Sequence, residues 1–371
     1  MAYDEVKLVE LTSYISRGIT PSYAETEGMC VINQKCIRNG VLSLAEARLH
    51  NESKKKVPTD KIIQPMDILV NSTGTGTLGR VAQVTSNIRA TVDSHVTIVR
   101  PAKEVNPLFL GYAVKWRQPY IEALAEGSTG QTELSRFRLG DEITIPLPSL
   151  AEQKQIAETL FAIDCKINTN SMINDNLLQQ AFALFDDMFK GLRSSDDGKV
   201  GDHIVPRRGK TLLSKNAVDG DVPVVAGGLE PSTYHNTANT VPPVITISAS
   251  GANAGFVNLW SVPVWSSDST FIDATMTDAV YFWFVLLKRR QQEIYDAQTG
   301  SAQPHIYPQH IADLPLGELP ISKIAEYQNL VSPFFATIGS NKSENARLAA
   351  IRDSLLPRLM SGAIDVSDIN I

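Results

Sequence analysis

The sequence predicts an α+β protein built by internal duplication, in which two globular domains with mixed β-sheets are joined by two long antiparallel helices. Its 371 residues allow two or three domains at the usual domain size. A pattern of apolar strand, glycine-rich turn and apolar helix occurs twice, and each copy is followed by a helical pattern of about 40 residues. The predicted order is a domain at 1–148, a helix at 149–195, a second domain at 196–320 and a second helix at 321–371.

The two domain copies match over much of their length. DILVNSTGTGTLGRV at 67–81 indicates a strand that runs into a Ser/Gly-rich turn, and VITISASGANAGFV at 244–257 has the same layout. An apolar helical segment at 108–116 is matched 172 residues later by 280–288. The further matches at this offset are Gln131 with Gln303, Leu139 with Ile311, Asp141 with Asp313 and Pro148 with Pro320. A constant offset over about 40 residues favours duplication over coincidence.

Both helical patterns have start and stop signals. Ser149 and Glu152 form a capping box at the start of the first, whereas the second begins near Ser322 without one. Gly191 and Gly362 are expected to end them. The apolar positions that step by four and three are Ile156, Leu160, Ile163, Ile167, Leu177, Ala181, Leu184 and Met188, then Leu330, Phe334, Leu348, Ile351, Leu355 and Leu359. Such spacing keeps one face against one partner helix over roughly 60 Å.

Both apolar patterns turn polar in the middle. Asn170 and Asn174 interrupt the first, and Thr337, Asn341 and Glu344 interrupt the second. If the helices are antiparallel partners, these midpoints face each other and form one buried polar layer, which weakens a coiled coil but fixes its register. The alternative is a local break or an exposed hinge.

Composition and charge restrict the class of protein. The chain is 43% hydrophobic and 20% charged, which is enough to bury full cores and too apolar for disorder. A formal charge of -6 argues against a generic basic nucleic-acid coat. The excess of acid lies mainly at 196–320, with 8 basic and 13 acidic residues, whereas 1–148 has 17 basic and 16 acidic residues. Local basic patches remain compatible with this balance.

The sequence also favours a cytoplasmic location. No secretory or transit pattern opens the chain, and the longest apolar run, at 279–287, has nine residues, too few for a membrane span. The three cysteines, Cys30, Cys36 and Cys165, are odd in number and lack metal-ligand spacing. We therefore expect a reduced protein without a membrane partner.

No catalytic, cofactor or metal site is predicted in this chain. The string Gly74 to Gly79 has the GxGxxG form, but the residues at 80–85 alternate like a strand, whereas a dinucleotide loop must open a helix. The turn is either a plain β-turn or one whose amides approach a phosphate backbone. The six histidines are scattered, and the spacing of five between His305 and His310 does not suit a helical ligand pair.

A recognition surface remains as the best candidate function. Basic clusters occur at 54–56, at 207–210 and at 288–290, and Ser/Thr/Gly/Gln segments occur at 127–132 and 299–305. Small hydroxyl residues allow close approach to DNA, arginine and lysine contact phosphate or guanine, and glutamine contacts adenine. Each cluster alone is also compatible with an ordinary solvated surface, but the clusters recur at matched places in both domains.

These features resemble the specificity subunit of a type I restriction–modification enzyme. The resemblance is carried by Ile145 to Ile156 (IPLPSLAEQKQI), by Leu355 to Gly362 (LLPRLMSG) and by Ser128 to Gln131, and the architecture extends it to the whole chain. The sequence departs from the pattern where Gln153 is replaced by Tyr327 in the second half, which leaves any symmetric contact of this glutamine in doubt.

The resemblance implies two target-recognition domains, each reading half of a split double-stranded DNA site. The helices would act as the spacer and as the docking surface for two methyltransferase subunits, which would bind S-adenosylmethionine, and restriction or translocase subunits would join in some systems. This chain would itself be non-catalytic. The predicted DNA-binding residues are Arg17, Thr20, Ser72, Thr73, Arg80, Gln131 and Arg136 in the first domain, and Arg207, Arg208, Lys210, Ser248, Ser250, Asn253, Gln303 and His305 in the second.

Three alternatives stay open at this point. The same frame could serve a structural adaptor that joins proteins without reading DNA, and the acidic second domain is compatible with that. An enzyme could use the glycine-rich turn on a nucleotide. A specificity subunit of a methylation-only system would have the same sequence features, because the difference lies in its partners.

Overall fold

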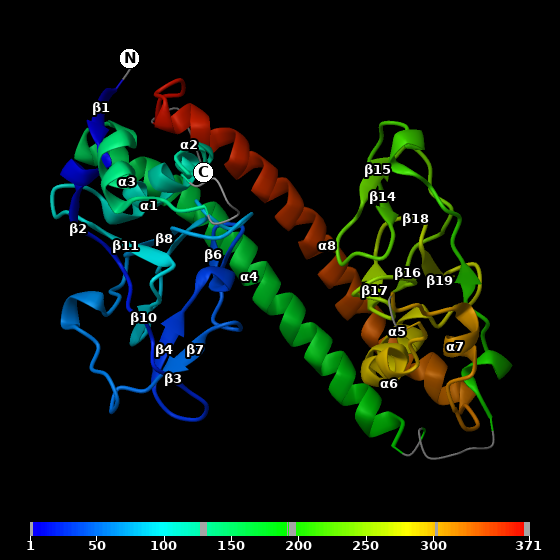
Figure 1. The fold of residues 1–371 in the computed structure, drawn as a ribbon. Coiled ribbons are helices and arrows are strands. Elements are labelled where there is room, and N and C mark those ends of the chain that lie inside the picture. The colour runs from blue at the N-terminus through cyan, green and yellow to red at the C-terminus, as the bar shows by residue number, and fades with distance from the viewer. Residues whose placement is uncertain (1–2, 127–131, 191, 193–197, 301–302, 367–371) are drawn as a thin grey trace. The chain divides into compact units, whose positions relative to one another are not determined.

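The computed structural model describes residues 3–126, 132–190, 192, 198–300 and 303–366, and it divides the chain into two compact units. The first unit contains Met1–Cys165 and Leu348–Ile371, and the second contains Lys166–Arg347. Each unit holds one globule together with parts of two long helices, α4 (Leu150–Met188) and α8 (Ile321–Met360) (Figure 1).

The globule of the first unit is built on two four-stranded sheets. The first sheet is antiparallel and has the order β2-β11-β8-β9; its strands are β2 (Thr12–Arg17), β11 (Val96–Pro101), β8 (Ile68–Asn71) and β9 (Val81–Gln83). The second has the order β10-β4-β7-β3, with β10 parallel to β4; its strands are β10 (Ala90–Val92), β4 (Met29–Ile32), β7 (Arg48–His50) and β3 (Tyr23–Ala24). β11 contributes side chains to two buried hydrophobic clusters of this globule, because Val99 lies in one cluster and Ile98 in the other.

Helices and short strands complete this globule. The helices are α1 (Pro107–Trp116), α2 (Gln118–Ala123) and α3 (Arg136–Glu142), and the remaining strands are β1 (Asp4–Lys7), β12 (Thr144–Leu147), β5 (Ile37–Arg38) and β6 (Val41–Leu42). Asn106 caps α1 by accepting hydrogen bonds from the amides of Leu108 and Phe109, and α1 packs its apolar residues against the same buried cluster as α4.

The second unit repeats this plan, with three strands in its second sheet where the first unit has four. Its antiparallel sheet β13-β19-β16-β17 contains β13 (Arg207–Arg208), β19 (Ser269–Asp273), β16 (Val244–Ser248) and β17 (Val257–Trp260). A three-stranded sheet contains β15 (Thr233–His235), β14 (Val222–Val225) and β18 (Trp265–Ser266), again with one parallel pair. The helices are α5 (Val280–Arg289), α6 (Gln291–Asp296) and α7 (Pro308–Ala312). The internal duplication predicted from the sequence is therefore confirmed at the level of strand order.

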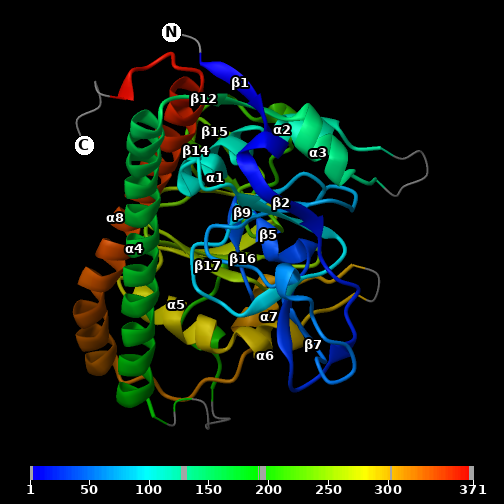
Figure 2. The ribbon, with the colours of Figure 1, turned by 90° about the vertical axis from the view of Figure 1, so that its left-hand side faces the viewer.

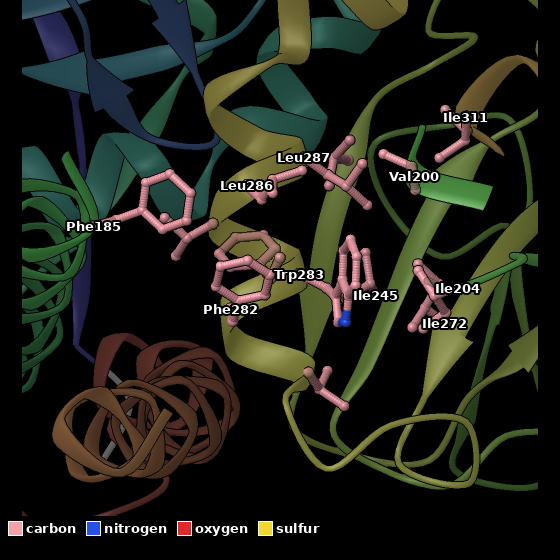
Figure 3. Close-up of a cluster of buried hydrophobic side chains, with 14 of the residues drawn as sticks. Phe185, Val200, Ile204, Ile245, Ile272, Phe282, Trp283, Leu286, Leu287 and Ile311 are labelled. Carbon is pink, nitrogen blue, oxygen red and sulfur yellow. The ribbon is translucent and has the colours of Figure 1, made fainter. Parts of the chain in front are cut away.

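The core of the second unit joins its sheet to the long helices. Ile245 and Ile272 of the sheet, Phe282 and Trp283 of α5, and Phe185 of α4 belong to one buried cluster (Figure 3). Phe185 and Phe282 have ring centroids 5.7 Å apart, and Tyr327 of α8 meets Phe185 edge-on at the same distance. Such aromatic packing fastens the globule to the helices of its own unit.

The two long helices have the predicted lengths, 39 and 40 residues, and run antiparallel beside each other within each unit (Figure 2). The capping box of α4 is present, because Ser149 N donates to Glu152 Oε2 at 3.0 Å and Glu152 N donates to Ser149 Oγ at 3.3 Å. Gly362 follows the end of α8 with a φ of 69°. Gly191 lies outside the described residues.

The polar layer between the helices is also confirmed. Asn170 is buried and donates to Glu344 Oε2 at 2.7 Å and to Asn345 Oδ1 at 2.9 Å. Asn341 donates to Asn174 Oδ1 at 2.9 Å. A local break or exposed hinge is thereby excluded, since the helices continue through this layer with their polar groups paired.

The predicted apolar pattern of α8 needs a correction. Leu330 and Ile351 are exposed, and Thr337 is also exposed and bonds to Pro333 O of its own helix. The buried hydrophobic side chains of α8 are those of Tyr327, Val331, Phe335, Ile338, Leu356, Leu359 and Met360. A helix that packs against both α4 and a globule carries more than one apolar row, so a single 4-3 pattern can follow the wrong one.

The contact made by Gln153 has a counterpart in spite of Tyr327. Gln153 Oε1 accepts from the Asn106 amide at 2.9 Å, beside the start of α1. In the second unit Gln328 Oε1 accepts from the amides of Tyr281 and Phe282 at the start of α5. The glutamine contact thus persists one residue further along, and Tyr327 donates instead to Ala181 O at 2.9 Å.

Candidate nucleic-acid interface

A polar cluster lies at the end of the β2-β11-β8-β9 sheet in the first unit. Arg17, the last residue of β2, pairs with Glu133 at 2.5 Å and donates to Leu134 O at 2.7 Å. Thr73 follows β8 and shares a hydrogen bond of 2.7 Å with His95 Nδ1, and its backbone is bridged to Glu133. Four residues far apart in the sequence are therefore brought to one sheet end.

An open groove of about 620 Å³ lies beside this cluster and is lined by Arg17, Glu133, Arg136 and Phe137, among others. Phe137 is 67% exposed, and the guanidinium carbon of Arg136 lies 4.9 Å from its ring centroid. Lys61 Nζ donates to Ser16 Oγ at 2.5 Å on the groove wall, and burial lowers the pKa of this amine. Exposed aromatic and cationic groups side by side suit stacking and phosphate contacts with nucleic acid.

The second unit has a matching cluster at the end of its own antiparallel sheet. Arg208 of β13 pairs with Asp268 at 2.5 Å, and the Ser250 hydroxyl also donates to Asp268. His305 is bridged to Ser250 through the backbone, and its ring stacks on Tyr307 with centroids 6.0 Å apart. Arginine, hydroxyl, carboxylate and imidazole thus occur together in both units.

The other predicted residues lie at or near these sheet ends with fewer side-chain contacts. Arg80 donates to Gly76 O at 2.7 Å and so braces the glycine-rich turn. Asn253 is half-buried in the equivalent turn of the second unit, where its carbonyl accepts from the Phe256 amide. The exposed ones are Thr20, Arg136, Arg207, Lys210 and Gln303. Gln131 lies outside the described residues.

Two predicted contact residues are placed differently. Ser72 is fully buried, and its hydroxyl bonds to that of Thr97 and to Val70 O. Ser248 is buried in β16, in register with Ser269. Both hydroxyls are therefore buried within the sheet, whereas DNA contacts at these positions would need exposed hydroxyls. Alternation along a strand fails to identify the outer face when both faces are covered.

The basic cluster at 288–290 supports the fold of its unit. Lys288 Nζ donates to Val257 O, Arg289 pairs with Asp186 of α4, and the buried Arg290 donates to Pro315 O at 2.6 Å. In the first unit Arg138 is similarly bonded to Glu126 and Glu142. A run of positive residues in the sequence is thus not by itself a nucleic-acid contact.

Sequence reasoning missed several members of the clusters. His95, Glu133 and Asp268 join the predicted arginines, and Phe137 and Tyr307 supply the exposed rings. The sequence signal that could have identified two of them is their place in the repeat, because His95 and Asp268 each stand immediately before a strand, β11 or β19.

The glycine-rich turn leads into a strand, as predicted. Gly74, Gly76 and Gly79 have positive φ values of 97°, 72° and 84°, and β9 begins at Val81. Among the described residues no group of three or more His, Cys, Asp or Glu side chains could hold a metal ion. The helices of the described ranges include none that is both long and apolar enough to cross a membrane.

Comparison with known proteins agrees with this architecture. Residues 3–179 match the type I restriction modification DNA specificity domain. A candidate type I specificity subunit of Mycoplasma genitalium is 26% identical over 283 residues, covering 69% of this chain and 71% of that protein. One of Mycoplasma pneumoniae is 23% identical over 288 residues, covering 71% of this chain and 75% of that protein.

A solved structure shares the fold over nearly the whole length. The S subunit of a type I restriction-modification system from M. genitalium has a TM-score of 0.61 and 18% sequence identity, with 96% of each chain covered. That similarity supports the paired globules and the two long helices. The match of residues 3–179 and the two relatives make this chain similar in sequence to type I restriction–modification specificity subunits, and the solved structure shows that it shares the fold of one of them.

Proposed function

We propose that this chain reads a bipartite double-stranded DNA site, with one globule on each half-site, for a type I restriction–modification complex. The observation that carries the proposal is the recurrence of one arginine, hydroxyl, carboxylate and imidazole cluster at the same sheet end of both units. An adaptor that only joins proteins would not need such a cluster twice. The matched DNA specificity domain favours DNA as the ligand of these sheet ends.

The long helices would act as the spacer between half-sites and as the docking surface for two methyltransferase subunits. Each added base pair moves a site by about 3.4 Å and turns it by roughly a tenth of a turn, so continuous helices suit a fixed spacing. In the second unit, Met172 is 64% exposed and Leu330 is 48% exposed. Exposed apolar side chains on a helix favour burial against a partner.

The chemistry would reside in the partners, and this chain would be non-catalytic. Methyltransferase subunits would bind S-adenosylmethionine and methylate adenine, and restriction or translocase subunits would join where the system cleaves DNA. A methylation-only system would use this chain in the same way. The complex would work in the cytoplasm, where it meets the chromosome.

Sequencing of methylated adenines in cells with and without this gene tests the proposal. We expect one bipartite motif that disappears when the gene is deleted. Arg208→Ala is expected to relax or weaken only one half of that motif, because Arg208 belongs to one globule. Equal loss in both halves would contradict independent readers.

A gel-shift assay tests the division of work between subunits. The chain has a net charge of -6, so phosphate contacts from this subunit alone should give weak binding. Tight, site-specific binding is expected only after the methyltransferase subunits are added. Equal affinity with and without them would overturn this part of the proposal.

A further inference from the structure

The polar clusters of the two units contain the same kinds of side chain, but two of these have exchanged places. In the first unit the carboxylate is Glu133 and the imidazole is His95. In the second unit the carboxylate is Asp268 and the imidazole is His305.

The backbone shows which positions are equivalent. Ser72 N donates to His95 O at 2.8 Å, and Ala249 N donates to Asp268 O at 3.2 Å, so His95 and Asp268 occupy the same place before the strand. The next residue in each chain segment, Thr73 or Ser250, is bridged to Glu133 in the first unit and to His305 in the second. Glu133 and His305 also form a second matched bridge, to Glu126 and Thr299 respectively. Acid and imidazole have therefore swapped positions between the units.

The arginine follows the acid through this exchange. Arg17 pairs with Thr97 across the sheet and Arg208 pairs with Thr270, which makes the two arginines equivalent. Each arginine contacts its carboxylate at 2.5 Å, although Glu133 precedes α3 and Asp268 precedes β19. The arginine–carboxylate couple is thus common to both units, whereas the position that supplies the acid is not.

Stability does not account for this couple. Arg17 is 28% exposed and Glu133 is 62% exposed, and the values for Arg208 and Asp268 are 41% and 34%. Ion pairs with this much solvent contact contribute only about 0–1 kcal/mol. An exposed pair that both copies retain at a sheet end is better explained by a ligand.

The couple has bonding capacity left over. In the described part of the chain, Arg17 uses Nη1 for Glu133 and Nη2 for Leu134 O, and Nε has no partner. Asp268 accepts from Arg208 and Ser250, and a carboxylate can accept about four hydrogen bonds. A guanidinium matches the O6 and N7 acceptors of guanine, and a carboxylate accepts from the N4 amino group of cytosine.

We propose that each arginine–carboxylate couple reads one G·C base pair, with Arg17 and Glu133 in one half-site and Arg208 and Asp268 in the other. This inference rests on the proposed function and adds the identity of a base pair. It also assigns Glu133 and Asp268 as specificity residues on a surface where acids would otherwise repel DNA.

Exchange variants of the full chain, assembled with its methyltransferase subunits, test the proposal. Glu133→His alone removes the acid and is expected to weaken binding to the cognate duplex about ten-fold and to relax one G·C position of the methylated motif. His95→Asp added to it copies the second unit, and the double variant is expected to return to within about three-fold of the parent. Asp268→His with His305→Glu is the reciprocal pair. Arg89→Ala, at an exposed arginine paired with Glu52, is the control and should change neither quantity.

Several results would overturn the inference. A half-motif without any G·C pair would do so directly, as would relaxation at an A·T pair. If the double variant binds the cognate duplex no more tightly than Glu133→His, the acid is needed at position 133 itself, and an arginine–carboxylate couple formed from position 95 does not replace it. If the parent complex methylates no bipartite motif, the proposed function fails and this inference with it; a motif that is present but unaffected by the variants refutes the inference alone.

Discussion

The two globules share one arrangement of strands but use different side chains at equivalent places. Comparing them shows which features belong to the fold and which to the individual side chains. Buried carboxylates are one example. In the first unit Asp67 receives two hydrogen bonds from Arg100, at 2.8 and 2.7 Å. In the second unit Asp273 lies on the strand equivalent to that of Arg100. Its carboxylate accepts hydrogen bonds from the backbone amides of Val241 and Thr275 and from the Thr275 hydroxyl. The two units therefore share the strand arrangement, but the groups that bond to the buried carboxylate differ between them.

Breaking these two carboxylate sites should have unequal effects. Asp67→Ala is expected to destabilise the first unit by about 3–5 kcal/mol, because it leaves the largely buried Arg100 without its carboxylate. Asp273→Ala should cost less, about 1–3 kcal/mol, because only neutral donors lose their acceptor. Native-state hydrogen exchange of the β8 and β16 amides measures both losses in the full chain. Equal losses would show that the charge on Arg100 is unimportant.

The joints between globule and helices differ in the same way. In the first unit Tyr112 of α1 donates to Asp164 of α4 at 2.6 Å, and Arg352 of α8 donates to the same carboxylate at 2.7 Å. In the second unit Tyr281 of α5 stacks on Phe335 of α8 with centroids 4.5 Å apart. One joint is a hydrogen-bonded charge network, and the other is aromatic.

Replacing Tyr112 should therefore make the first joint weaker and less sensitive to pH. Tyr112→Phe is expected to cost about 1–2 kcal/mol at neutral pH, because it removes a hydrogen bond to a carboxylate. Burial, and then the bond to Asp164, raise the pKa of Tyr112 above its usual value. Because the folded pKa exceeds the unfolded one, this contribution is complete below pH about 10 and is lost as the pH rises beyond it. The variant should thus show a shallower alkaline loss of stability.

The free energy of unfolding in urea between pH 7 and 11, followed by hydrogen exchange of the α1 amides, measures this loss of stability. Tyr120→Phe, at an exposed tyrosine of the same unit, is the matched control and should leave stability at neutral pH unchanged. An unchanged alkaline slope in Tyr112→Phe would mean that this phenol does not contribute to it.

Local signals explain why the frame could be predicted. The capping box of Ser149 and Glu152, the glycine at 362 and the polar midpoints of α4 and α8 are short-range or periodic features, and each was found where predicted except for Thr337, which faces solvent. The position of Ser72 depends on what covers both faces of its sheet, which periodicity does not report. The exchange of His95 and Glu133 with Asp268 and His305 joins segments far apart in sequence, so one sequence without the fold could not reveal it.

The smallest expected effect concerns one hydroxyl pair in the two antiparallel sheets. Ser72 and Thr97 are hydrogen-bonded in the first unit, and their counterparts in the second are Ala249 and Thr270. With alanine at that position, the buried Thr270 Oγ1 has no hydrogen-bond partner within the described chain. An unpaired buried hydroxyl costs free energy, so the second unit carries a small defect that the first does not.

Restoring the partner should remove that defect. Ala249→Ser is expected to stabilise the second unit by about 1 kcal/mol, and Thr270→Val should do so by a similar amount because it removes the unpaired hydroxyl. The reverse change, Ser72→Ala, should destabilise the first unit by about 1 kcal/mol by leaving Thr97 as Thr270 is now. Native-state hydrogen exchange of the β11 and β19 amides measures the change in stability of all three variants. A stabilising Thr270→Val with a destabilising Ala249→Ser would show that the strand lacks room for the second hydroxyl, and that the two sheets differ in packing as well as in bonding.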